Sequence, residues 1–152
     1  MKKVSILLTA LVVPVLVVFF LRQFGKNRFD IPVLYQDNLS EWPADCEKPE
    51  VLPFYVSDSL AAGSSGKPVL VLFGEPPAEA RLRLPQEVDT GVVRIIPLEV
   101  SNETLTCRFG ASRSAGAVLI DSSRRVRGVY HRLDRDETDK IIMEIKILLN
   151  DY

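Results

Sequence analysis

The apolar residues of this chain form one long run near the N-terminus and several short runs beyond residue 67. The long run extends from Val4 to Leu21, after Lys2 and Lys3. Its length predicts a helix of roughly 27 Å, close to the hydrocarbon thickness of a bilayer. A cleaved signal peptide has a shorter apolar region that ends in small residues, and Phe19–Phe24 offers no such site. We therefore expect an uncleaved membrane-spanning helix within residues 1–24.

The short runs predict the strands and helices of a mixed α/β domain. Brief apolar runs that end at Gly, Pro or Asp are typical of buried strands. The expected strands are 69–73, 92–100, 117–120 and 126–130, and the last two form a hairpin. Helices are expected at 78–84, at 103–109 and near the C-terminus. Pro85 is expected to end or kink the first of these helices.

The C-terminal helix has the clearest pattern. Asp134 and Glu137 have capping-box spacing, with an aspartate as the N-cap residue. Apolar side chains then recur at helical spacing and form one stripe, which consists of Ile141, Ile142, Ile145, Leu148 and Leu149.

The order of these elements is that of the thioredoxin arrangement, β-α-β followed by β-β-α, which several other α/β folds share. We therefore predict an α/β fold, thioredoxin-like, with an N-terminal transmembrane helix. The expected organisation is a membrane anchor at 1–24, a juxtamembrane stalk at 25–50 and a thioredoxin-like domain at 51–152. Apolar clusters in the stalk suggest that it packs onto the domain in places.

Composition and charge exclude several classes of function. The chain has 19 basic and 20 acidic residues and no basic stripe, so nothing favours nucleic acid as a partner. The local arginines between 124 and 135 face an anionic surface or partner, or form a solvated face balanced by neighbouring acids. One histidine and two cysteines make a poor inventory for a metal site. We expect no cofactor, and a copper site from Cys46, Cys107 and His131 is the less favoured alternative.

Cys46 and Cys107 leave three readings open. In an oxidising compartment they form one structural disulfide, which would close a loop of about sixty residues and stabilise the fold by ~4 kcal/mol. They are otherwise two separate, unreactive thiols. A redox-active pair is less favoured, because neither residue has the helix-start context that lowers a thiol pKa.

Parts of the chain resemble a known family. Phe109–Ala111, Ala117–Asp121 and Val126–Tyr130 resemble the closing half of thioredoxin-like proteins. Thr138–Leu149 looks like the final helix of Sco/SenC-type members in particular, and Gly25–Val33 is similar to the juxtamembrane stretch of some bacterial Sco-like proteins. The resemblance reports fold more than activity.

The resemblance implies a protein that is anchored in the membrane by one N-terminal helix and has its domain in the periplasm. Such a protein delivers copper to cytochrome c oxidase or exchanges thiols and disulfides. The family's working residues are two cysteines in a C-x-x-x-C loop and one histidine. Here the corresponding loop, Gly74–Glu79, holds no cysteine, and the histidine position falls near Arg113. The proline of redox-active thioredoxins falls near Ala115. Neither activity is therefore carried over to this chain.

The functional expectation is a membrane-anchored, non-catalytic Sco/SenC-like protein of the bacterial inner membrane, with its domain facing the periplasm. It would act as a binding or assembly factor for a respiratory or envelope complex, with a protein partner that the sequence does not identify. No catalytic, cofactor-binding or metal-ligating residue is assigned. The alternatives are a copper chaperone or thiol-disulfide oxidoreductase that uses Cys46 and Cys107, and a structural envelope protein with no link to the family.

Overall fold

The computed structural model describes residues 12–20, 30–60, 66–98 and 103–150. The chain divides into two units, Met1–Asp30 and Ile31–Tyr152, which are described separately.

Within the first unit, residues 12–20 are helical. Across the described ranges, no helix is both long enough and apolar enough to cross a membrane. The membrane-spanning helix predicted within 1–24 is therefore corrected, and the remainder of that range lies outside the described residues.

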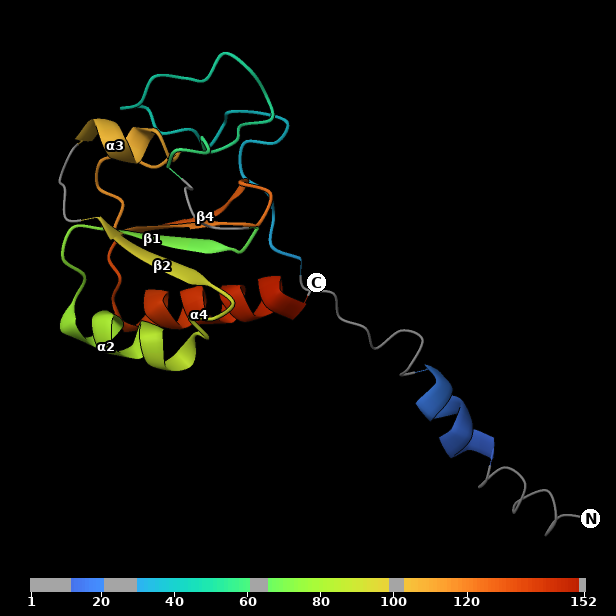
Figure 1. Ribbon diagram of the computed structural model, residues 1–152. Helices are drawn as coiled ribbons and strands as arrows, with labels where there is room; N and C mark the ends of the chain where they lie inside the picture. The colour runs from blue at the N-terminus through green and yellow to red at the C-terminus, as the bar shows by residue number, and fades with distance from the viewer. Residues whose placement is uncertain (1–11, 21–29, 61–65, 99–102, 151–152) are drawn as a thin grey trace, which may run out of the picture. The chain divides into compact units, whose positions relative to one another are not determined.

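The second unit is built around a four-stranded sheet with the order β2-β1-β3-β4 (Figure 1). The strands are β1 (Val69–Phe73), β2 (Arg94–Leu98), β3 (Ala117–Ile120) and β4 (Val126–Tyr130), and the helices are α2 (Ala78–Glu87), α3 (Glu103–Cys107) and α4 (Arg135–Asn150). β1 pairs in parallel with β2 and antiparallel with β3, and β3 pairs antiparallel with β4.

The fold-class prediction is corrected to a mixed α/β domain with a four-stranded sheet, and the thioredoxin fold is not confirmed. The prediction rested on element order, which several α/β folds share. One face of the sheet is covered largely by residues 31–60, whose chain forms turns and bends without a helix or strand. Element order alone says nothing about such an irregular layer.

Two prolines lie inside regular elements of the second unit. Pro97 lies in β2, which is at the edge of the sheet and pairs only with β1 among the described strands. An edge strand tolerates a residue without an N–H group. Pro85 lies inside α2, which continues to Glu87 instead of ending at Leu84. Residues 99 and 100, which we expected to extend β2, lie outside the described ranges.

Helices α2 and α4 cover one face of the sheet (Figure 1). Leu84 of α2 and Ile141 and Ile145 of α4 are buried there against Leu70 and Leu119 of the central strands. The N-cap contact of α4 is present, because the Asp134 carboxylate accepts the Glu137 N–H at 3.0 Å. The Glu137 carboxylate in turn accepts N–H groups from the turn before the helix.

The opposite face is covered by residues 31–60 and the short helix α3 (Figure 1). Tyr35, Trp42 and Cys46 are buried in one cluster with Val71 and Val118 of the central strands. The segment predicted as a stalk therefore contributes buried side chains to the core of the second unit from Ile31 onward, while residues 25–29 lie outside the described ranges.

Candidate functional site

The loop after β1 and the start of α2 are exposed, and their two glutamates pair with arginines of the helices. Gly74 adopts a left-handed conformation with φ of +68°, which suits a glycine at the end of a strand. Glu75 lies 3.3 Å from Arg81, and Glu79 lies 3.8 Å from Arg83 and 3.9 Å from Arg135. The two carboxylates are thus partners of arginines on the surface of the helical layer.

The cysteines lie on the other face of the sheet, where Cys46 and Cys107 form a disulfide with their Cα atoms 5.3 Å apart. The bond joins residues 31–60 to the end of α3. Beside it, the Asp45 carboxylate accepts the Arg113 N–H at 3.0 Å, and this bond holds the pKa of Asp45 below its usual range. Arg113, near which the family histidine would fall, therefore anchors the cysteine-bearing loop.

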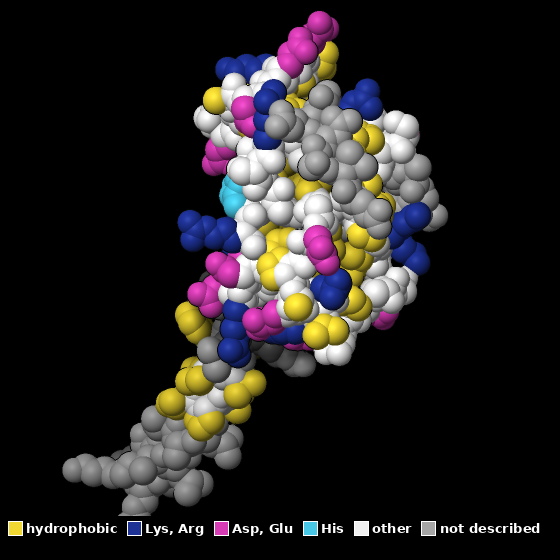
Figure 2. Space-filling view, turned by 90° about the vertical axis from the view of Figure 1, so that its left-hand side faces the viewer, with side chains coloured by type: hydrophobic (Ala, Val, Ile, Leu, Met, Phe, Trp, Pro, Cys, Tyr) yellow, Lys and Arg dark blue, Asp and Glu magenta, His cyan; other side chains and the backbone are white. Residues whose placement is uncertain are grey.

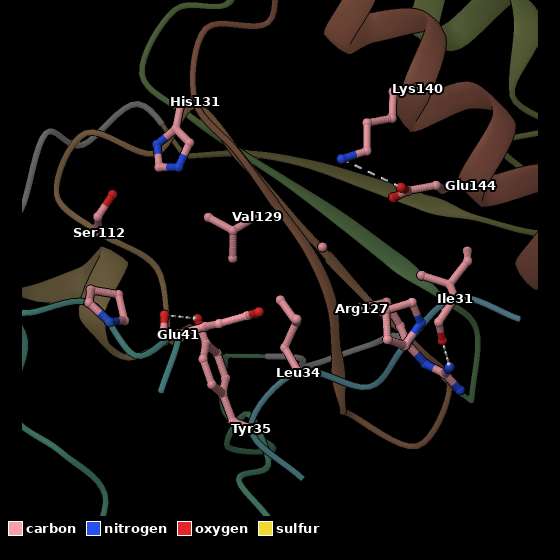
Figure 3. Close-up of a pocket in the computed structure, with 13 residues that line it drawn as sticks. Ile31, Leu34, Tyr35, Glu41, Ser112, Arg127, Val129, His131, Lys140 and Glu144 are labelled. Carbon is pink, nitrogen blue, oxygen red and sulfur yellow. Dashed lines mark hydrogen bonds and ion pairs between the residues drawn. The ribbon is translucent and has the colours of Figure 1, made fainter. Parts of the chain in front are cut away.

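His131 does not join the two cysteines in a metal site. Within the described part of the chain, no three His, Cys, Asp or Glu side chains gather so that they could hold a metal ion. The His131 backbone N–H donates to Glu137 at 3.0 Å, and its ring faces a groove beside β4 (Figure 3). On the face shown in Figure 2 the single histidine lies among acidic and basic side chains that alternate without forming a patch of one sign.

The groove has a volume of about 370 Å³ and runs along the outer edge of β4. Val129 lies near its centre, with His131 and Ser112 toward one end and Ile31 and Arg127 toward the other (Figure 3). One side is formed by residues 31–43 and the other by α4, and the remaining lining residues are Pro32, Leu34, Tyr35, Glu41, Pro43, Gly128, Lys140 and Glu144. Aliphatic side chains thus form the base, and charged groups lie at the rim.

The side of the groove formed by α4 is fixed by a polar contact. The Tyr130 hydroxyl donates a short hydrogen bond to the Glu144 carboxylate, and the Lys140 ammonium lies 3.8 Å from the same carboxyl group. Burial and the neighbouring Glu144 raise the pKa of Tyr130 far above its usual range, so the phenol stays protonated as a donor. Gly128 leaves room for this contact, since a Cβ atom there would lie 2.5 Å from the Tyr130 hydroxyl oxygen.

The opposite side depends on Tyr35. Its φ of +60° turns the chain away from β4, and its hydroxyl donates to the Gly110 carbonyl at 2.7 Å. Burial, with a smaller contribution from Glu41, raises the pKa of Tyr35 to about 12. The ring also packs edge-to-face on Trp42, with the ring centroids 4.8 Å apart. A buried, hydrogen-bonded aromatic side chain therefore holds this side in place.

One end of the groove is closed by the chain itself. The Leu34 N–H donates to the Val126 carbonyl at 2.9 Å, and the Arg127 guanidinium donates to the Ile31 carbonyl. Arg127 is oriented by the fully buried Asp121 carboxylate, which lies 2.9 Å from its Nε atom. Residues 31–34 are thus attached to the beginning of β4.

The arginines near β4 are mostly paired, which favours the reading of a balanced, solvated face. Arg124 lies 2.7 Å from Asp58, and Arg125 lies 2.8 Å from Asp121. Exposed pairs of this kind contribute little to stability.

Comparison of the chain with protein-family models, curated proteins and solved structures finds no match. The resemblance to Sco/SenC-type proteins therefore stays a prediction. The groove itself was not predicted, because it is formed where residues 31–43 meet β4 and α4, far apart in the sequence. The apolar clusters Ile31–Tyr35 and Trp42–Pro43 were the signal that this segment packs on the domain.

Proposed function

We propose that this protein is a non-catalytic binding protein outside the cytoplasm, which acts as a binding or assembly factor for a respiratory or envelope complex. The observation that carries the proposal is the Cys46–Cys107 disulfide, which uses both cysteines of the chain. Thiol exchange and Cu(I) binding need a thiolate. With both sulfurs bonded to each other, the folded protein offers none.

Three further points support the proposal. Disulfides persist mainly in oxidising compartments, so the bond favours a location outside the cytoplasm. The resemblance of Gly25–Val33 and Thr138–Leu149 to Sco/SenC-type proteins favours a role near a respiratory complex, because that family serves cytochrome c oxidase. The groove beside β4 supplies a surface on which a partner can bind.

The test is a count of thiols and copper on the full chain, produced in a bacterial periplasm and purified without reductant. We expect alkylation to leave the intact mass unchanged and equilibration with Cu(I) to leave no bound metal. The control is a Cys46→Ala/Cys107→Ala double variant, which should match the wild type in copper content.

Free thiols that capture one copper per chain would overturn the proposal in favour of a copper chaperone. Reduction of a protein disulfide by the pre-reduced chain, lost in the double variant, would instead favour a thiol-disulfide oxidoreductase. Either result would assign chemistry to Cys46 and Cys107 and remove the basis for a purely binding role.

A further inference from the structure

We propose that the groove beside β4 binds an extended peptide segment of a partner protein, which adds to the sheet as a strand along Gly128–Tyr130. This inference rests on the proposed binding function and names the kind of partner. It is argued from the two edges of the sheet, from the path of the chain beside β4 and from the chemistry of the groove.

The two edges of the sheet differ in their capacity to accept another strand. β2 forms one edge and carries Pro97, which has no N–H group to donate. β4 forms the other edge and, among the described strands, pairs with β3 alone. In an antiparallel pair, successive residues alternate in the direction of their main-chain groups, so an edge strand keeps hydrogen-bonding groups on its outer side.

Residues 31–34 of the chain itself cover the beginning of the β4 edge but not the rest of it. The Leu34 N–H donates to the Val126 carbonyl at 2.9 Å, as a neighbouring strand would. The next residue, Tyr35, has φ of +60° and turns the chain away from the edge. Beyond that point, the groove opens beside Gly128 and Val129.

The dimensions and lining of the groove fit a short extended peptide. Gly128–Tyr130 spans roughly 10 Å at the rise of a strand, which corresponds to about three peptide residues. Val129 and Leu34 provide an aliphatic base for one apolar side chain of the ligand. Ser112 and His131 at the far end provide polar groups for the residue that follows. Main-chain bonds would then supply affinity, and the base of the groove would supply specificity.

A short peptide fits better than a second copy of this chain. Twofold antiparallel pairing of two β4 strands would place the Val126 end of each strand beside the Tyr130 end of the other. Residues 31–34 occupy the edge at Val126, so the second strand would collide with them. A segment that pairs only with Gly128–Tyr130 avoids this collision.

The probe is a phage-displayed library of random heptapeptides, selected on the full chain, from which the strongest binder is synthesised. We expect an apolar residue at a fixed position in the selected sequences. The Tyr130 carbonyl accepts the Gly116 N–H on the β3 side, so by alternation Val129 directs its main-chain groups outward and Gly128 does not. Binding of the synthetic peptide should therefore slow amide hydrogen exchange at Val129 and leave that of Gly128 unchanged. Two versions of the peptide are then N-methylated, one at the odd-numbered and one at the even-numbered amides, which removes N–H donors and keeps the side chains. Only one of these two sets faces β4, so one version should bind at least tenfold more weakly.

Two variants test the location of the site. Val129→Arg places a charged side chain at the base of the groove and should weaken peptide binding at least tenfold. Val92→Arg is the matched control, because Val92 is 41% exposed beside the opposite edge of the sheet, and it should bind as the wild type does. Ser112→Trp, which fills the groove from a loop, gives a second test if Val129→Arg does not fold.

The inference is overturned if no heptapeptide is selected, or if the selected peptide binds Val129→Arg and Ser112→Trp as tightly as the wild type. Equal binding of all N-methylated peptides would exclude strand addition. A dimer in sedimentation that Val129→Arg dissociates would show self-pairing instead. These failures leave the thiol and copper counts unchanged, so they are distinguishable from failure of the proposed function.

Discussion

The two faces of the sheet are covered in different ways. On one face, α2 and α4 bury regular stripes of apolar residues, such as Ile141 and Ile145, against the central strands. On the other face, residues 31–60 form an irregular layer attached by the Cys46–Cys107 disulfide and by the Tyr35 hydrogen bond to Gly110. A helix distributes its stabilisation over a repeating pattern. The irregular layer relies on a few contacts that do not repeat, so single changes there should cost more.

The largest expected effect is removal of the disulfide. The bond connects residues 61 apart in the sequence. On the chain-entropy model, Cys46→Ala/Cys107→Ala should lower the free energy of unfolding by ~4 kcal/mol. Urea denaturation of the variant and the wild type measures the difference. Wild-type protein in excess reductant should lose a similar amount, and an unchanged midpoint in both cases would show that the irregular layer does not depend on the bond.

Gly110→Ala should have the next largest effect. Gly110 has φ of +69°, and a Cβ atom there would lie 2.8 Å from the Tyr35 ring and 3.1 Å from the Trp42 ring. Strain and overpacking together should cost about 3 kcal/mol in thermal or urea denaturation. The matched control is Gly66→Ala, at φ of +75° with no atom within 4 Å of the new Cβ, which should cost about 1 kcal/mol. Equal losses would show that the aromatic packing on Gly110 contributes nothing.

On the helical face, a single capping contact should matter less. The Asp134 carboxylate accepts the Glu137 N–H at 3.0 Å at the start of α4. Asp134→Ala should lower the free energy of unfolding by ~1 kcal/mol. Asp136→Ala, in the first turn of the same helix, should cost only about 0.3 kcal/mol through the helix dipole. If Asp134→Ala lowered the free energy of unfolding by more than Gly110→Ala does, the helical face and not the irregular layer would be the more sensitive to single changes.

The smallest expected effect is a pH dependence from Glu137. Burial opposes its charged form, but N–H groups of His131, Leu133 and Arg132 outweigh burial and hold the pKa of Glu137 below its usual range. A lowered folded-state pKa contributes stability above the ordinary glutamate value of about 4.3, and this stability is lost as pH falls through the folded value. The free energy of unfolding of the wild type should therefore fall below about pH 4, and Glu137→Gln should make this fall smaller. Identical slopes of unfolding free energy against pH would contradict this assignment.

The same difference between the faces explains which parts of the fold could be predicted. The strands at 69–73, 117–120 and 126–130 are confirmed, because each is a short apolar run with a clear end. The N-cap role of Asp134 at the start of α4 is confirmed for a similar reason, since its signal is local.

The remaining features depend on contacts between distant residues. Pro97 is compatible with an edge strand, but the order of the strands cannot be read from local spacing. The thioredoxin-like assignment, which rested on element order, is not confirmed. Residues 31–60 have no period, so neither their position over the sheet nor the groove could be derived from spacing. The pairing of Cys46 with Cys107 was one of three open readings, because Cα separation cannot be read from a sequence.

Where the irregular layer begins has a practical consequence for anyone who shortens this protein. The compact unit starts at Ile31. A fragment that starts at residue 51 would lose Tyr35, Trp42 and Cys46 and would leave Cys107 as an unpaired thiol. It would also uncover aliphatic residues of the central strands, such as Val71 and Val118. Exposed apolar surface of that kind promotes aggregation, so expression fragments should retain the chain from before Ile31.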